Sequence, residues 1–197
     1  VKNVLGEPKT VRSLNLAGTG MSEVSQLETP FLYHLNLSHN NITNLNDKVF
    51  ERTTLLESLD LSHNFIGDLS TSVRKIWPVL KSIQYLNMSN NPILSIKQGD
   101  LDGLESLRLL SIENLEECTK MERNAFKSLI NLAELRAYNY PRLGYLDVQG
   151  ILRSLPVLQK LDIEIKDAAV GSDQLQSALH PRLQELGIRG PRLRSIS

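Results

Sequence analysis

The chain has 197 residues, of which 41% are hydrophobic and 22% charged, a composition typical of a folded protein with a core and unlike that of a disordered one. Lysine plus arginine and aspartate plus glutamate number 22 each, so the formal net charge is zero and the basic excess typical of nucleic-acid-binding domains is missing. No apolar run approaches the ~20 residues that span a bilayer. The chain opens at Val1 without a signal peptide, so we interpret it as a piece of something longer, with any membrane anchor outside it.

Three segments of the chain overlay without gaps on one pattern, L-x-x-L-x-L-x-x-N-x-I-x-x-L. These are residues 32–45, 56–69 and 83–96, with the asparagine at Asn40, Asn64 and Asn91. A weaker copy begins at Val11, where Thr19 replaces the asparagine, and four drifting copies follow. We therefore treat residues 1–197 as a single array of about eight repeats. The repeats start near residues 11, 32, 56, 83, 107, 132, 158 and 183.

Each repeat is expected to contribute one short strand. The motif L-x-x-L-x-L places its last two leucines two residues apart, so both point to the same side of a strand. Because one coil cannot bury its apolar side alone, the strands should pair in parallel and stack their leucines into a shared core. The asparagine turns the chain out of the strand, and its amide is expected to bond to unpaired backbone groups and to form a ladder along the array.

The second half of each repeat is expected to return along the convex side. Three return segments carry apolar residues at helical spacing, which predicts short helices there. They are residues 70–80, 124–132 and 147–158. In the first, Val73, Ile76 and Trp77 should pack inward. Pro78 should limit that helix, because proline lacks the backbone N–H.

The later repeats depart from the pattern. Those starting at 107 and 132 carry asparagine one place early, at Asn114 and Asn139, and their next apolar anchors come one place late, which we interpret as a locally widened turn. The repeats at 158 and 183 lack the asparagine, so the ladder is expected to break there. Residues 166–182 form the least regular segment, expected to be a polar loop followed by a convex helix.

These repeats resemble the extracellular leucine-rich repeat family over residues 11–196, and Phe50 and Phe126 in the return segments match its longer class of repeat. The chain is similar to the ectodomains of Toll-like, chaoptin-like and Slit-like proteins. The resemblance implies an α/β fold, the leucine-rich repeat solenoid or curved horseshoe, with a parallel β-sheet on the concave face and short helices and loops on the convex face. It also implies a protein-binding recognition module of a cell-surface receptor or adhesion protein, located outside the cell or at its surface. A structural extracellular-matrix scaffold and a cytoplasmic adaptor or substrate-recognition domain remain alternatives, which flanking sequence would separate.

The sequence shows no catalytic pattern, so we expect no enzyme, no cofactor and no metal. His39 and His63 occupy the same position in adjacent repeats, which raises the question of a metal site. A serine-histidine-asparagine turn explains them equally, and no third ligand is apparent. The lone cysteine, Cys118, cannot form an internal disulfide and replaces an apolar anchor, so a buried, inert thiol is expected.

Three N-x-S/T sequons mark candidate glycosylation sites, at Asn36, Asn41 and Asn87. The sequons at Asn36 and Asn87 also follow from the repeat pattern itself and fall on the expected concave strands, where a glycan would obstruct a ligand. Asn41 falls in the turn after the strand, so it is the best candidate for a chain that is secreted.

The solvent-facing strand positions of the later repeats predict a partner-binding patch for a protein ligand or co-receptor. Its members come from three successive repeats: Tyr85, Arg108, Leu109, Arg136 and Tyr138. Tyrosine and arginine are enriched at binding hot spots, although an ordinary solvated strand face would show the same alternation. Strand alternation predicts that Arg108, Arg136 and Tyr138 are all solvent-exposed.

Overall fold

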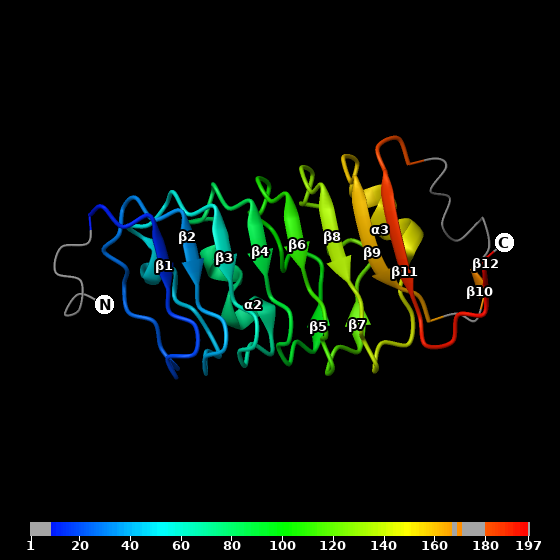
Figure 1. Ribbon diagram of the computed structural model, residues 1–197, viewed down its shortest axis with the longest axis horizontal. Coiled ribbons are helices and arrows are strands. Elements are labelled where there is room, and N and C mark those ends of the chain that lie inside the picture. The colour runs from blue at the N-terminus through cyan, green and yellow to red at the C-terminus, as the bar shows by residue number, and fades with distance from the viewer. Residues whose placement is uncertain (1–8, 167–168, 171–179, 197) are drawn as a thin grey trace.

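The computed structural model describes residues 9–166, 169–170 and 180–196, and there the chain coils around an eight-stranded sheet (Figure 1). All neighbouring strands of this sheet are parallel, and each comes from the next repeat along the chain. In spatial order the strands are β1 (Ser13–Asn15), β2 (His34–Asn36), β3 (Ser58–Asp60), β4 (Tyr85–Asn87), β6 (Leu109–Ser111), β8 (Glu134–Ala137), β9 (Lys160–Glu164) and β11 (Glu185–Arg189). The prediction of a solenoid with a parallel sheet is therefore confirmed.

The middle leucine of each strand lies in one row across the sheet. The partners in this row are Leu14, Leu35, Leu59, Leu86, Leu110, Leu135, Leu161 and Leu186. From Leu35 to Leu161 none is more than 2% exposed. The fully buried side chains of Phe50, Trp77 and Phe126 close the core from the return side. The core thus runs along the array, and each coil relies on its neighbours for burial.

The helices are short and lie behind the sheet, on the return side of the coils (Figure 1). They are η1 (Asp47–Phe50), α2 (Leu69–Ser72), η2 (Arg74–Ile76) and α3 (Val148–Ser154). Asp68 caps α2 by accepting the N–H of Ser70, and Asp147 caps α3 by accepting the N–H of Gly150. The helices expected in 70–80 and 147–158 are confirmed, the first as the pair α2 and η2.

The expected inward packing of the first return segment is also confirmed, because Val73, Ile76 and Trp77 are fully buried. The indole Nε1 of Trp77 donates to the carbonyl of Asp100 at 2.9 Å, which satisfies its one polar atom inside the core.

The helix predicted for 124–132 is wrong: this segment forms a series of turns, although Phe126 and Leu129 are buried as that helix would bury them. Its polar side chains bond to the preceding coil instead. The Ser128 hydroxyl donates to the carbonyl of Leu101, and the Asn131 amide donates to the carbonyl of Glu105. These bonds tie the segment to the neighbouring coil, and the apolar spacing alone did not decide its local structure.

Two small parallel sheets lie beyond the turns. One joins β5 (Ser95–Ile96) to β7 (Lys120–Met121), and the other joins β10 (Ala169–Val170) to β12 (Ser195–Ile196). Most of the segment 166–182, with its expected loop and helix, lies outside the described residues.

In the first repeats, the asparagine that follows each strand forms hydrogen bonds to the backbone of its own coil and of the adjacent coil. Asn64 is only 4% exposed, and its Oδ1 accepts the N–H of Ile42 at 3.0 Å. Its amide donates to the carbonyls of Leu37, Leu61 and Ser62. Asn40 and Asn91 make equivalent bonds in the coils on either side. The predicted ladder is therefore present from the first repeat to Asn91.

The early asparagines of the next two repeats are not displaced ladder residues. Asn114 and Asn139 have φ angles of 54° and 64°, and they stand where His39, His63 and Asn90 have φ angles of 53° to 57°. Asparagine tolerates this left-handed backbone better than most residues. These asparagines therefore serve the bend just before the ladder position.

Other polar groups replace the ladder in the later coils. Tyr140 stands at the ladder position, is fully buried and donates its hydroxyl to the carbonyl of Ile112. Glu164 accepts the N–H groups of Asn139 and Tyr140, and Lys166 bonds to Glu164 and to the Tyr140 carbonyl. Burial raises the pKa of Tyr140 well above its usual value. The amide ladder stops earlier than predicted, before the repeat at 107, and these groups satisfy the backbone beyond it.

Candidate protein-binding face

The candidate site is the solvent side of the eight-stranded sheet, here called the sheet face. In it Tyr85 and Leu109 are paired residues of β4 and β6, and Leu109 in turn pairs with Glu134 of β8. Arg136 pairs with Ser111, two residues further along the same strands. Strand pairing thus brings Tyr85, Leu109 and Arg136 into one region, as predicted.

The five predicted patch residues differ in exposure. Arg108 and Arg136 are exposed, whereas Tyr85 and Leu109 are half-buried. The half-burial of Tyr85, followed by the negative charge of Asp60, raises its pKa, and Arg136 acts in the opposite direction. Arg136 therefore lies close enough to Tyr85 to stabilise its ionised form.

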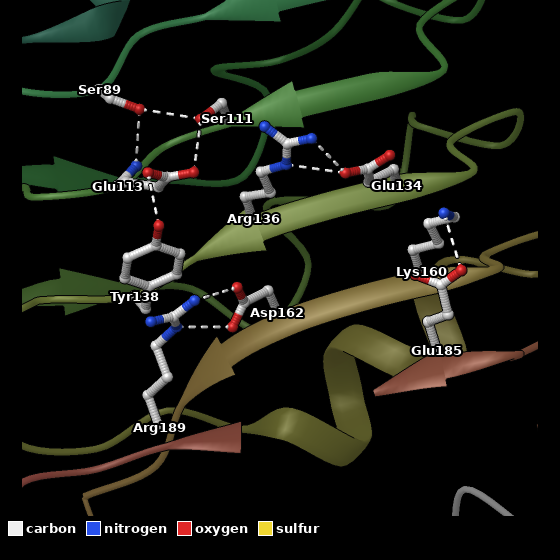
Figure 2. A network of polar contacts seen from close by, with 10 residues as sticks. All are labelled: Ser89, Ser111, Glu113, Glu134, Arg136, Tyr138, Lys160, Asp162, Glu185 and Arg189. Atoms are coloured by element: carbon white, nitrogen blue, oxygen red, sulfur yellow. Dashed lines mark hydrogen bonds and ion pairs between the residues drawn. The ribbon is translucent and has the colours of Figure 1, made fainter. Parts of the chain in front are cut away.

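Tyr138 is half-buried, not solvent-exposed as predicted. The guanidinium of Arg189 lies over its ring, 4.1 Å from the ring centroid, and its hydroxyl donates to Glu113 at 2.8 Å (Figure 2). Its pKa is raised, first by burial and then by the bond to Glu113. Arg189 comes from β11, two strands beyond β8 in the sheet, so this cover was not visible from the local alternation around Tyr138.

A bidentate ion pair holds Arg189 in place. Its Nε and Nη2 donate to the two carboxylate oxygens of Asp162 at 2.9 and 2.8 Å, and this pairing raises the pKa of Arg189 further above its usual range. Gly187 makes room for the pair, because a Cβ there would lie 2.8 Å from Oδ1 of Asp162. The stack of Tyr138, Arg189 and Asp162 therefore depends on a glycine two residues before the arginine.

Two further ion pairs complete this half of the sheet face (Figure 2). Arg136 contacts Glu134 at 2.7 Å, and Lys160 contacts Glu185 at 2.8 Å. With Asp162 and Gly187, these residues line a shallow hollow between β8, β9 and β11. Exposed pairs of this kind contribute little to stability, so their main effect is to orient the side chains.

The charges on the sheet face from β4 to β11 balance. Apart from the buried pair of Glu164 and Lys166, the basic side chains here are Arg108, Arg136, Lys160 and Arg189, and the acidic ones are Glu113, Glu134, Asp162 and Glu185. Three of the four bases are paired with an acid, and Arg108 is the exposed base for which no partner is found within the described residues.

The two aligned histidines stack on each other. The rings of His39 and His63 have centroids 4.0 Å apart and an interplanar angle of 12°. Burial, followed by the charge of His39, lowers the pKa of His63. Parallel rings do not point two nitrogens at one ion, and in the described part of the chain no three metal-ligating side chains gather.

Cys118 is fully buried, and burial raises its thiol pKa, so the thiol is in the unreactive form. Within the described residues no helix has the length and apolarity needed to cross a bilayer.

The three sequons occupy different settings. Asn36 and Asn87 are half-buried at the ends of β2 and β4, and their Oδ1 atoms accept the N–H groups of Ser38 and Ser89. Asn41 is exposed in the turn after the ladder residue, as predicted from the repeat pattern.

Comparison with known proteins supports the repeat assignment. A family model described as leucine rich repeat matches residues 30–73, and a second matches residues 82–115. Tsukushi of Gallus gallus is 33% identical over 81 residues, which cover 41% of this chain and 22% of Tsukushi. Chaoptin of Drosophila melanogaster is 27% identical over 164 residues, which cover 83% of this chain and 12% of chaoptin. The chain thus spans less than a quarter of the length of either relative.

Solved structures share the fold. The TLR13–ssRNA13 complex superposes with a TM-score of 0.75 at 20% identity, covering 99% of this chain and 30% of that one. Human 5T4, the trophoblast glycoprotein, superposes with a TM-score of 0.70 at 18% identity, covering 94% of this chain and 76% of 5T4. Toll in its complex with Spatzle superposes with a TM-score of 0.65 at 19% identity, covering 86% of this chain and 23% of that one. Together with the stacked strands and the asparagine ladder, these matches show a leucine-rich repeat fold, and the chain resembles the extracellular leucine-rich repeat family.

Proposed function

We propose that this chain is a protein-binding recognition module of a cell-surface receptor or adhesion protein, and that its ligand or co-receptor contacts the sheet face from β4 to β11. The observation that carries the proposal is the pairing of Tyr85 with Leu109 beside Arg136, within a ring of charged side chains. An apolar centre with a polar rim is the usual anatomy of a protein–protein interface. Leucine-rich repeat arrays are generally non-enzymatic interaction modules, which agrees with this use.

The side chains around this centre are already ordered. Arg136, Lys160 and Arg189 each have an acidic partner on the same face. Because these side chains are held before a partner arrives, they lose less conformational entropy on binding than long, free side chains would. Ordered charges also reject partners of the wrong pattern, which gives specificity.

Balanced charge favours a protein over a nucleic acid as the partner. Nucleic-acid affinity comes largely from basic groups that neutralise phosphates. Outside the buried pair of Glu164 and Lys166, the sheet face from β4 to β11 carries as many acids as bases, and Arg108 is the one of its four described bases for which no ion pair is found. The TLR13 structure contains single-stranded RNA, but its 20% identity supports a shared fold alone.

A binding screen with matched variants tests the proposal. The chain is presented to an array of secreted proteins and ectodomains, and the affinity of each hit is measured for two double variants. Tyr85→Ala with Arg136→Ala should weaken binding by at least ~1 kcal/mol, about fivefold, if these side chains are hot spots. Tyr145→Ala with Lys127→Ala removes similar exposed side chains away from the sheet face and should leave affinity unchanged. If the first variant leaves affinity unchanged and the second weakens it, the interface lies outside the sheet face.

A further inference from the structure

An exposed phenylalanine stands on the turn edge of the array, outside the sheet face. Phe65 is 58% exposed, although it directly follows the buried ladder residue Asn64. Leu94, one coil further along, is 55% exposed. Its N–H bonds to the carbonyl of Gly67, which has no side chain to cover it. Covering this apolar surface with a ligand would remove it from water, which is favourable.

The neighbour of this phenylalanine on the other side is a glycosylation sequon. Asn41 follows Asn40 as Phe65 follows Asn64, so the two residues occupy equivalent positions in adjacent coils. The N–H of Phe65 donates to the carbonyl of Ile42 at 2.8 Å, which fixes the two coils against each other at this point. Paired segments lie about 5 Å apart, so Asn41 and Phe65 emerge side by side.

The side chains of this sequon are open to solvent. Asn41 and Thr43 are both exposed, and no hydrogen bond of the Asn41 side chain is found within the described residues. In the other two sequons the serines are buried: Ser38 is 5% exposed and Ser89 is 4% exposed. The Ser89 hydroxyl is further occupied by Ser111 and by the N–H of Glu113.

We propose that Asn41 carries an N-linked glycan whose first N-acetylglucosamine packs on the ring of Phe65. The inference rests on the proposed extracellular location, because the sugar donor is met on the secretory route. In the transfer, Nδ2 of Asn41 bonds to the anomeric carbon of a lipid-pyrophosphate-linked oligosaccharide. The pyrophosphate leaves with the bonding electrons, and the amide nitrogen loses one proton.

The contact has a simple physical basis. One face of a pyranose ring presents C–H groups, which carry a small positive charge, and the face of a phenyl ring is its negative side. The sugar also removes apolar ring surface from water. Leu94 lies in the next coil opposite Gly67, two residues after Phe65, so it is not the direct neighbour of Asn41.

The test uses the whole 197-residue chain behind a foreign signal peptide, secreted from cultured mammalian cells. Mass spectrometry measures occupancy of Asn41. The glycan is then trimmed enzymatically to a single ¹³C-labelled N-acetylglucosamine, and NMR records the sugar protons. Ring currents of Phe65 should shift these protons upfield in the wild type. Phe65→Leu, which keeps an apolar side chain but removes the ring, should abolish the shift, and the control Leu94→Ser should retain it.

Two results would overturn the inference. An unmodified Asn41 in the secreted protein refutes the modification site, and sugar shifts that are identical in Phe65→Leu refute the packing. If the partner found in the binding screen needs Phe65 and excludes the glycosylated protein, the surface serves that partner and the proposed cover is wrong. Because the signal peptide is supplied, none of these results depends on where the native protein resides, which the binding screen addresses separately.

Discussion

Replacing Asn64 with alanine tests the ladder at its centre. The amide of Asn64 meets three carbonyls, and each keeps another donor after the substitution. Leu37 keeps the amide of Asn40 at 3.0 Å, Leu61 keeps the amide of Asn91 at 2.9 Å, and Ser62 keeps the N–H of His39 at 3.0 Å. Only the N–H of Ile42 loses its acceptor, Oδ1 of Asn64. The loss therefore concentrates on one buried donor.

The expected cost follows from that count. A buried N–H without a partner costs about 1–3 kcal/mol. The small void left by the amide adds about 1 kcal/mol. Asn64→Ala should therefore lower the free energy of unfolding by about 2–4 kcal/mol. Asn139→Ala is the matched control: this asparagine is exposed, and among the described residues its side chain bonds only to Asn114. Its loss should therefore cost no more than about 1 kcal/mol, mainly from alanine in a left-handed backbone, and the bond of its N–H to Glu164 is kept.

Urea unfolding followed by tryptophan fluorescence measures both variants. The single tryptophan, Trp77, is fully buried in the same coil as Asn64, so its emission reports on the region that changes. A change below ~0.5 kcal/mol for Asn64→Ala would show that water replaces the amide at little cost. Equal costs for Asn64→Ala and Asn139→Ala would show that the two positions are equivalent, against the distinction made from their backbone angles.

Two further predictions concern the core. Leu61 is fully buried at the end of a strand between two regular coils, so Leu61→Ala should cost about 2–5 kcal/mol in urea unfolding, and a cost below ~0.5 kcal/mol would contradict its place in the core. Tyr140 stays protonated in the folded chain because its pKa is raised, whereas in the unfolded chain it ionises near pH 10. The unfolded state then binds fewer protons, so stability should be present below pH 10 and fall by about 1 kcal/mol from pH 10 to 11 on account of this residue. Tyr140→Phe should reduce that fall, and equal pH dependence in both proteins would show that Tyr140 ionises without unfolding.

The regular repeats were predictable because local and tertiary requirements coincide in them. Leu35, Leu59 and Leu86 occupy the same position within their repeats, and the spacing of apolar residues around them predicts which side of the strand is buried. Stacking then requires no further information, since identical coils bury identical faces. The strands, their parallel pairing and the core could therefore be read from the sequence.

The roles of residues in the later repeats could be assigned only from the structure, because the same residue type has a different role there than in the regular repeats. Asn114 and Asn139 look like ladder residues moved by one place, but their backbone angles put them in the bend before the ladder. Tyr140 looks like an ordinary aromatic residue, yet its hydroxyl takes over a bond to the backbone of the coil before it. Spacing records distances along the chain, whereas these roles depend on which carbonyl lies opposite in the neighbouring coil.

By itself the sequence determined the repeat, the fold and the residues that face solvent on the sheet. Only the tertiary structure decided how those residues are used, as Tyr138 illustrates. Its position in the strand places it on the sheet face, but Arg189, held by Asp162 and admitted by Gly187, covers its ring. Arg189 and Asp162 are 27 residues apart in the chain, and Arg189 and Tyr138 are separated by two repeats. Alternation fixes the direction of a side chain, and contacts between coils determine what remains open for a partner.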